Sequence, residues 1–121
     1  MGITHHSNYI RWMEEARVDY LEKIGFGYAR LEQDGVISPV LSVNCEYKKS
    51  TTFDDVITID TIVKDFNGIK LCLEYEMKNA KGEIVLIGQS VHGFINEKGR
   101  PIRVNKEFPD LYNALVAEIP Q

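Results

Sequence analysis

Four segments of this chain alternate between apolar and polar residues, and short turns join them. The segments span residues 40–48, 55–64, 69–78 and 83–96. Alternation with period two is typical of strands that bury one face, and the last segment is more apolar throughout, as expected of a central strand. The joining turns are short and contain Asn67-Gly68 and Gly82, which favours antiparallel hairpins. The sequence therefore predicts one antiparallel sheet of four strands.

A long amphipathic helix is predicted ahead of the strands, from Ser7 to about Ile24. Its apolar side chains recur at steps of three and four residues, which places them on one helical face. They are Tyr9, Trp12, Met13, Ala16, Tyr20, Leu21 and Ile24. Shorter helical stretches are predicted over 28–33 and 107–118. One aromatic-faced helix on one sheet makes a two-layer α+β domain, and a strand before residue 1 would complete the cover of so long a helix.

Composition and charge exclude several classes of protein. The 121 residues are 44% hydrophobic and 26% charged, which is typical of one soluble globular domain. A net charge of −4 argues against nucleic-acid binding. We expect no membrane span, because no apolar run approaches the roughly 20 residues required, and a cytoplasmic location, because no secretory signal is visible. Cys45 and Cys72 lack metal-ligand spacing and are interpreted as buried, reduced thiols.

The opening stretch from Gly2 to Tyr9 carries two adjacent histidines and continues into the helix with a recognisable pattern. Further parts of the pattern are Trp12, Glu14, Ala16 and Arg17, then Tyr47-Lys48-Lys49, Phe53-Asp54-Asp55, Gly88, His92, Phe94 and Gly99-Arg100-Pro101. Together they resemble the 4-hydroxybenzoyl-CoA thioesterase family of hotdog-fold proteins, and within it the subgroup that includes the Tol–Pal-associated acyl-CoA thioesterases. The resemblance covers nearly the whole chain.

This resemblance implies a hotdog fold, in which an antiparallel sheet wraps around a long central helix. The family has five strands, and four are visible here. Its first strand precedes the helix and ends in an aspartate just upstream of a pair that matches Met1-Gly2. We therefore expect residues 1–121 to form a single hotdog domain that is shortened at its N-terminus by that strand and that aspartate.

The resemblance also implies a thioesterase, which hydrolyses an acyl-CoA to a free acid and coenzyme A without a cofactor. A thioester carbonyl needs donors for its developing oxyanion, and the unpaired leading amides of a helix supply them. By resemblance, the His6 amide is this donor, and Tyr9 helps to line the pocket. The missing aspartate would be base or nucleophile. Lys48, Lys49 and Lys70 could meet the phosphates of coenzyme A.

Simpler readings of the same residues stay open. The His6 side chain could be an exposed helix-start residue without a role, and exposed lysines are usually only solvated. Glu14 is a tempting substitute for the missing carboxylate, yet its spacing from Arg17 favours a structural ion pair. No metal site is expected, because His5, His6 and the distant His92 do not form the HExxH zinc arrangement.

Two further expectations concern assembly and competing functions. Sites in the family lie between two subunits, so the resemblance implies a homodimer or a homotetramer. The alternative function is a non-catalytic acyl-CoA-binding or scaffold protein. A hotdog dehydratase is disfavoured, because the proline-rich histidine motif and the paired acid of that class are missing.

Overall fold

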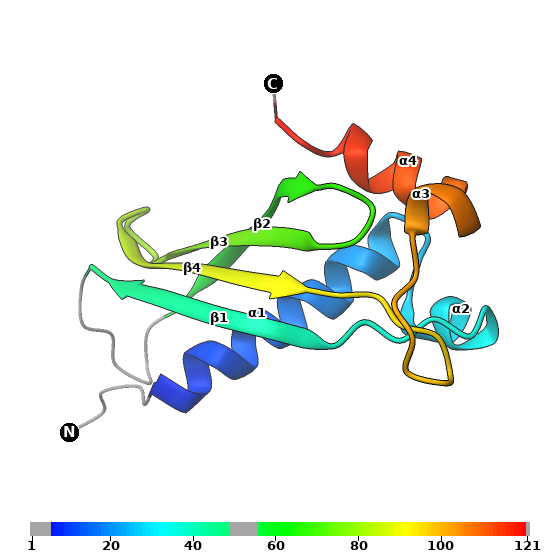
Figure 1. The fold of residues 1–121 in the computed structure, drawn as a ribbon. Coiled ribbons are helices and arrows are strands. Elements are labelled where there is room, and N and C mark those ends of the chain that lie inside the picture. Colours follow the sequence, from blue (N-terminus) through cyan, green and yellow to red (C-terminus); the bar gives the residue numbers. More distant parts are fainter. Residues whose placement is uncertain (1–5, 49–55, 121) are drawn as a thin grey trace.

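The fold is seen in a computed structural model that describes residues 6–48 and 56–120, with side chains from Tyr9 onward (Figure 1). His5, Lys49 and the predicted turn at Phe53-Asp54-Asp55 lie outside the described residues. Four helices and four strands follow one another as α1 (His6–Lys23), α2 (Tyr28–Gln33), β1 (Val40–Tyr47), β2 (Thr58–Phe66), β3 (Leu71–Lys78), β4 (Ile84–His92), α3 (Val104–Glu107) and α4 (Pro109–Ala117) in the described part.

The strands form one antiparallel sheet in the order β1-β4-β3-β2. The predicted sheet of four strands is confirmed, and β4 is a central strand as expected. β2 begins at Thr58, so Val56 and Ile57 lie before the strand rather than in it as predicted, and residue 55 lies outside the described residues. Thr58 pairs with Lys78, the last residue of β3, and the turn that Asn79 begins leaves Val56 and Ile57 without a partner in β3.

The predicted helix over 107–118 is confirmed as α4, which begins two residues later than predicted, and a short helix, α3, precedes it. Proline has no amide hydrogen and disfavours a helical conformation in the residue before it. Phe108, which precedes Pro109, accordingly leaves the helical region, with φ −136° and ψ 67°. α3 therefore ends at Glu107, and α4 begins at Pro109.

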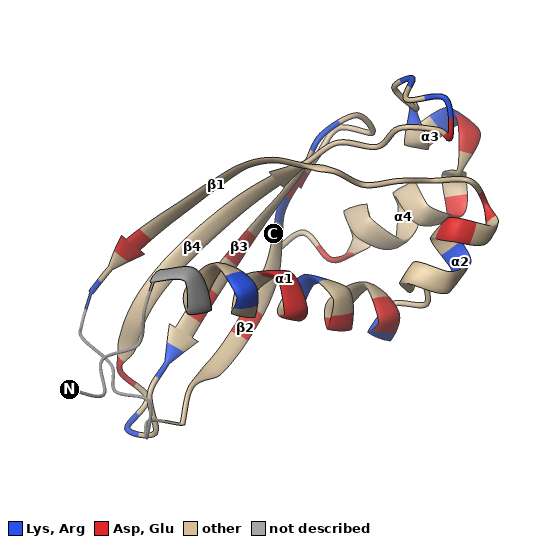
Figure 2. Cartoon of the chain, turned by 90° about the horizontal axis from the view of Figure 1, so that it is seen from below, with Lys and Arg blue, Asp and Glu red and all other residues tan. Residues whose placement is uncertain are grey.

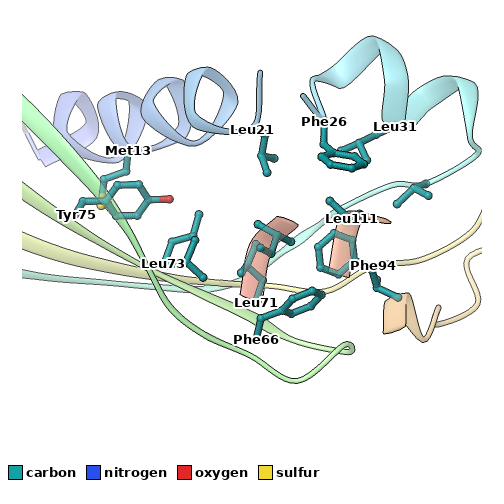
Figure 3. Packing of buried hydrophobic residues seen from close by; sticks show 14 of the residues in the cluster. Met13, Leu21, Phe26, Leu31, Phe66, Leu71, Leu73, Tyr75, Phe94 and Leu111 are labelled. Carbon is teal, nitrogen blue, oxygen red and sulfur yellow. The ribbon is translucent and has the colours of Figure 1, made fainter. Parts of the chain in front are cut away.

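α1 crosses one face of the sheet, and its Met13 side chain reaches Gly88 of β4 (Figure 1). A Cβ atom at Gly88 would overlap the Sδ atom of Met13, so the absence of a side chain there makes room for Met13 in its present conformation. Gly88 is flanked by Tyr75 of β3 and Cys45 of β1 in the register of the sheet. Met13 is buried there and points toward the Tyr75 ring in Figure 3.

A second part of the core lies where α2 and α4 close the end of the sheet. Figure 3 shows Phe26 and Leu31 near α2 facing Leu111 of α4, with Phe66 and Phe94 below them. The Phe66 and Phe94 rings lie 5.6 Å apart between centroids. This part of the core therefore closes the end of the sheet with residues from outside α1.

The two cysteines are free thiols, as predicted, but both are only half-buried. β1 is exposed along almost its whole length, so Cys45 has little cover. Cys72 alternates with the buried residues of β3 and thus lies on the face of the sheet away from the core. None of the helices within the described ranges is long and apolar enough to cross a membrane.

Candidate functional site

α1 begins at His6, the residue predicted to supply the oxyanion donor. Amides in the first turn of a helix have no intrahelical partner and lie at the positive end of its dipole. The backbone amide of His6 can therefore donate a hydrogen bond to an oxyanion, as the predicted role requires. The His6 side chain lies outside the described residues, so the predicted role of its imidazole stays a prediction.

Tyr9 lies three residues after His6, and its ring belongs to the core rather than to an open surface. Only 3% of the residue is exposed. Its ring makes edge contacts with Trp12 of α1 and Tyr47 of β1, at centroid distances of 5.3 and 5.4 Å. Tyr9 therefore joins the start of α1 to the end of β1, and a direct role in catalysis stays a prediction.

A groove of about 550 Å³ lies between α1 and β1, and we call it the α1–β1 groove. Ile10 and Met13 of α1 form one wall, and Val40 and Val43 of β1 form the opposite wall. The volume is within the range of sites that bind small molecules. The groove exists because α1 packs closest to β2, at the other edge of the sheet, and leaves β1 exposed along most of its length.

The floor of the groove carries a chain of three buried polar side chains, Tyr75, Ser90 and His92. A hydrogen bond of 2.8 Å joins Tyr75 Oη to Ser90 Oγ, and another of 2.7 Å joins Ser90 Oγ to His92 Nε2. His92 Nδ1 is buried and makes no hydrogen bond to any described residue. We call these three side chains the floor chain.

Burial sets the protonation states of the floor chain. It lowers the pKa of His92 to about 4, helped by the charge of Arg17 and opposed by Glu14, so the imidazole is neutral at pH 7. Burial also raises the pKa of the Tyr75 hydroxyl, which therefore keeps its proton. The floor of the groove is uncharged but rich in hydrogen-bonding groups.

Sequence reasoning included His92 in the resemblance but gave it no role. One sequence signal could have identified His92 as part of a buried polar network. Ser90 and His92 flank an apolar residue on a predicted central strand, so both must lie on the same face. Two polar side chains on the core face of a central strand are costly unless they are hydrogen-bonded, and such a pair predicts a buried network.

The predicted Glu14–Arg17 pair is present beside the groove. Arg17 Nη2 lies 2.5 Å from Glu14 Oε1, and Arg17 Nε donates a second bond to Glu14 Oε2 at 3.3 Å. The Arg17 side chain is 12% exposed, whereas that of Glu14 is 48% exposed and also lines the groove. Figure 2 shows basic and acidic residues following one another along α1.

The structure does not bring the predicted coenzyme A lysines together. Lys48 follows the end of β1 and pairs with Glu46, whereas Lys70 precedes β3 in the turn formed by Asn67. In the register, Val40 at the start of β1 and Leu71 at the start of β3 both pair with His92. Lys48 is eight residues further along β1, or about 26 Å at 3.3 Å per residue. Lys48 and Lys70 of one chain thus lie at opposite ends of the sheet, and Lys49 lies outside the described residues.

A helix laid across an antiparallel sheet, with a groove at the helix start, defines a thioesterase-like hotdog protein. The whole chain, residues 1–121, matches the family model described as "Thioesterase-like superfamily". The chain therefore belongs to this superfamily, and the predicted fold and family are confirmed. The narrower assignment to the Tol–Pal-associated subgroup stays a prediction.

Individual relatives agree with the family match. The chain is 36% identical over 115 residues to "Putative acyl-CoA thioesterase YneP" of Bacillus subtilis (strain 168), which covers 94% of this chain and 83% of the relative. It is 34% identical over 68 residues to the 4-hydroxybenzoyl-CoA thioesterase of Pseudomonas sp. (strain CBS-3), covering 54% and 48% of the two chains. Among solved structures, a DHNA-CoA thioesterase from Staphylococcus aureus superposes with a TM-score of 0.89 at 37% identity, covering 97% of this chain and 79% of that one.

Proposed function

We propose that this protein is an acyl-CoA thioesterase, which hydrolyses the thioester of an acyl-CoA to a free acid and coenzyme A. The observation that carries the proposal is the α1–β1 groove beside the start of α1, in a chain of the thioesterase-like superfamily. The relatives named as acyl-CoA thioesterases support the same chemistry.

The proposed mechanism uses the groove for the acyl group and the start of α1 for the thioester carbonyl. Water attacks the carbonyl carbon and gives a proton to a carboxylate, the oxyanion accepts hydrogen bonds from the leading amides of α1 including that of His6, and the carbon–sulfur bond then breaks. Preorganised backbone donors of this kind typically contribute about 10²–10³ in rate. The released thiolate takes up a proton and leaves as coenzyme A.

A carboxylate must attack the carbonyl or activate the water. The resemblance implies an aspartate ahead of the helix, and Glu14 is a described carboxylate that lines the groove. Glu14 is engaged by Arg17 through two contacts, which supports its structural role and leaves the aspartate as the proposed base or nucleophile.

The test measures free thiol released from a panel of short-chain, long-chain and aromatic acyl-CoAs. We expect turnover of at least one thioester by the native protein, and Glu14→Gln should keep more than about a tenth of it. Asp19→Asn is the matched control, because Asp19 is also a carboxylate of α1 but lies outside the α1–β1 groove. A loss of 100-fold or more in Glu14→Gln alone would transfer the catalytic role to Glu14. Tight binding of acyl-CoA without any turnover would contradict the proposal and favour the non-catalytic acyl-CoA-binding protein.

We propose that the working unit is a homodimer, or a homotetramer built from it. β1 is an edge strand that exposes Val40, Leu41, Val43 and Tyr47. An edge strand with apolar side chains favours pairing with another chain. Light scattering after size-exclusion chromatography should give at least twice the chain mass, and Leu41→Lys should reduce it. A cytoplasmic location stays a prediction.

A further inference from the structure

A second cavity, of about 520 Å³, lies further along α1 than the α1–β1 groove, and we call it the α1–α2 cavity. Val18 and Leu21 of α1 line it together with Leu31 of α2. Glu32 and Glu97 also line the cavity, but both are exposed, so their charges stay hydrated when the cavity is filled. The apolar part of the lining is therefore suited to a hydrocarbon chain.

The groove and the α1–α2 cavity are consecutive parts of one furrow along α1. Ile10, Glu14, Val18 and Leu21 follow one another at steps of four, four and three residues, which places them on one face of the helix. Of the described residues that line the two cavities, only Glu14 lines both. The opposite wall also continues, because the segment 35–38 beside the α1–α2 cavity leads into β1 beside the groove. Glu14 therefore stands at the boundary between them.

Arg17 holds the Glu14 side chain at this boundary. Its Nε and Nη2 atoms donate hydrogen bonds to the two carboxylate oxygens of Glu14, so the carboxylate has little freedom to turn aside. An apolar chain that passes this point must displace the pair or remove water from Glu14, which is 48% exposed. Removing water from a charged group is costly. The pair therefore separates two largely apolar cavities with a polar barrier.

The position of the barrier corresponds to a particular acyl length. Measured along the helix axis from His6, where the thioester carbonyl is proposed to bind, Glu14 lies about 12 Å away and Leu21 about 22 Å away, at about 1.5 Å per residue. Each carbon–carbon bond advances an extended chain by about 1.25 Å, so these distances match acyl chains of roughly 8–10 and 16–18 carbon atoms.

We propose that the Glu14–Arg17 pair determines the longest acyl chain that the protein accepts. The pair ends the acyl site at about ten carbon atoms, and the α1–α2 cavity receives the tail of a longer acyl chain only when the pair is removed. This inference rests on the proposed thioesterase function and adds the residues that select the substrate by length. The pair takes no part in the bond-breaking step.

The test measures kcat/KM for straight-chain acyl-CoAs from butanoyl-CoA to hexadecanoyl-CoA, below the concentrations at which they form micelles. Each methylene group buried in an apolar site favours the longer substrate. We therefore expect kcat/KM to rise up to octanoyl-CoA or decanoyl-CoA. Beyond the barrier it should fall, and hexadecanoyl-CoA should be at least about tenfold worse than octanoyl-CoA.

Variants of α1 then test whether the pair causes the limit. Glu14→Ala/Arg17→Ala removes both charges, so that neither is left unpaired, and should raise the hexadecanoyl-to-octanoyl ratio of kcat/KM at least about tenfold. Asp19→Ala/Lys23→Ala is the matched control, because it also removes one acidic and one basic side chain but from outside both cavities, and should leave the ratio unchanged. Adding Val18→Trp to the alanine variant fills the α1–α2 cavity and should restore the limit.

A second variant keeps the test decisive if the alanine variant fails to fold. Glu14→Leu/Arg17→Met retains side-chain volume on α1 but leaves no charge to dehydrate, and the Met side chain changes shape at little cost. The hexadecanoyl-to-octanoyl ratio should therefore rise at least about fivefold.

Binding of thioethers supplies a readout that does not need hydrolysis. Isothermal titration should show tighter binding of octyl-CoA than of hexadecyl-CoA by the native protein, and Glu14→Ala/Arg17→Ala should remove this preference. If no thioester is hydrolysed but the thioethers show the limit, the thioesterase function fails and the barrier keeps its role.

Two results would overturn the inference and leave the thioesterase function standing. One is equal hydrolysis of octanoyl-CoA and hexadecanoyl-CoA by the native protein, or a ratio that neither variant of the pair changes. The other is that Val18→Trp lowers the assembled mass of the protein without restoring the limit, which would assign the α1–α2 cavity to a second copy of the chain.

Discussion

Burial of a neutral histidine makes the stability of this protein depend on pH in a way that one variant can isolate. The pKa of His92 is lowered from 6.5 to about 4 by burial, so the unfolded chain binds a proton between these values that the folded chain does not. Stability is therefore fully present above about pH 6.5 and is lost as the pH falls toward 4. At pH 5 the loss from this one group is about 2 kcal/mol, and it approaches about 3 kcal/mol below pH 4.

The assay is urea unfolding of the native protein and of His92→Gln at pH 7 and pH 5, followed by the fluorescence of Trp12, the single tryptophan. Other titrating groups act on both proteins, so the difference between their pH effects belongs to His92. With m values of about 1–3 kcal/mol/M, the native midpoint should fall by about 0.7–2 M more than the midpoint of the variant. Protein concentration is held fixed, because assembly also contributes to stability. Equal shifts in the two proteins would refute the assignment of a buried, neutral His92.

Other predictions concern packing and turn geometry. Gly88→Ala crowds the Met13 side chain and should cost about 1–3 kcal/mol, but clearly less when combined with Met13→Ala; additive losses in this double-mutant cycle would show that the two residues do not touch. Leu73→Ala empties a fully buried position on β3 and should cost about 2–5 kcal/mol in urea unfolding, and a loss below 1 kcal/mol would contradict its place in the core. Gly82→Ala has free space around the new methyl group but a φ of +79°, so a loss of about 1 kcal/mol is expected from the backbone alone; unchanged thermal unfolding would show that the turn can relax.

Most of the fold could be predicted because each element has a strong local signal. The apolar face of α1 and the alternation in β1 and β3 indicate element type without knowledge of what lies beside them. Element ends depend on partners instead. β2 begins where β3 can pair with it. The apolar pattern continues through Phe108, and only the backbone preference of the residue before Pro109 separates α3 from α4.

The candidate site was less predictable, since it depends on side chains that meet across strands. The Glu14–Arg17 pair was visible because its partners lie three residues apart on one helix. Tyr75 and Ser90 meet only through the register of β3 with β4, which no local pattern states. The same register separates Lys48 from Lys70, two residues that sequence reasoning had placed in one binding role.

One wall of the α1–β1 groove belongs to a strand that is also an edge of the sheet. Any chain that pairs with β1 will stiffen that wall and restrict Val40 and Val43. Ligand binding and subunit association would then be thermodynamically linked, and each would strengthen or weaken the other by the same factor. Ligand affinity measured on dilute protein would consequently differ from the affinity at high protein concentration, with no change in any residue that touches the ligand.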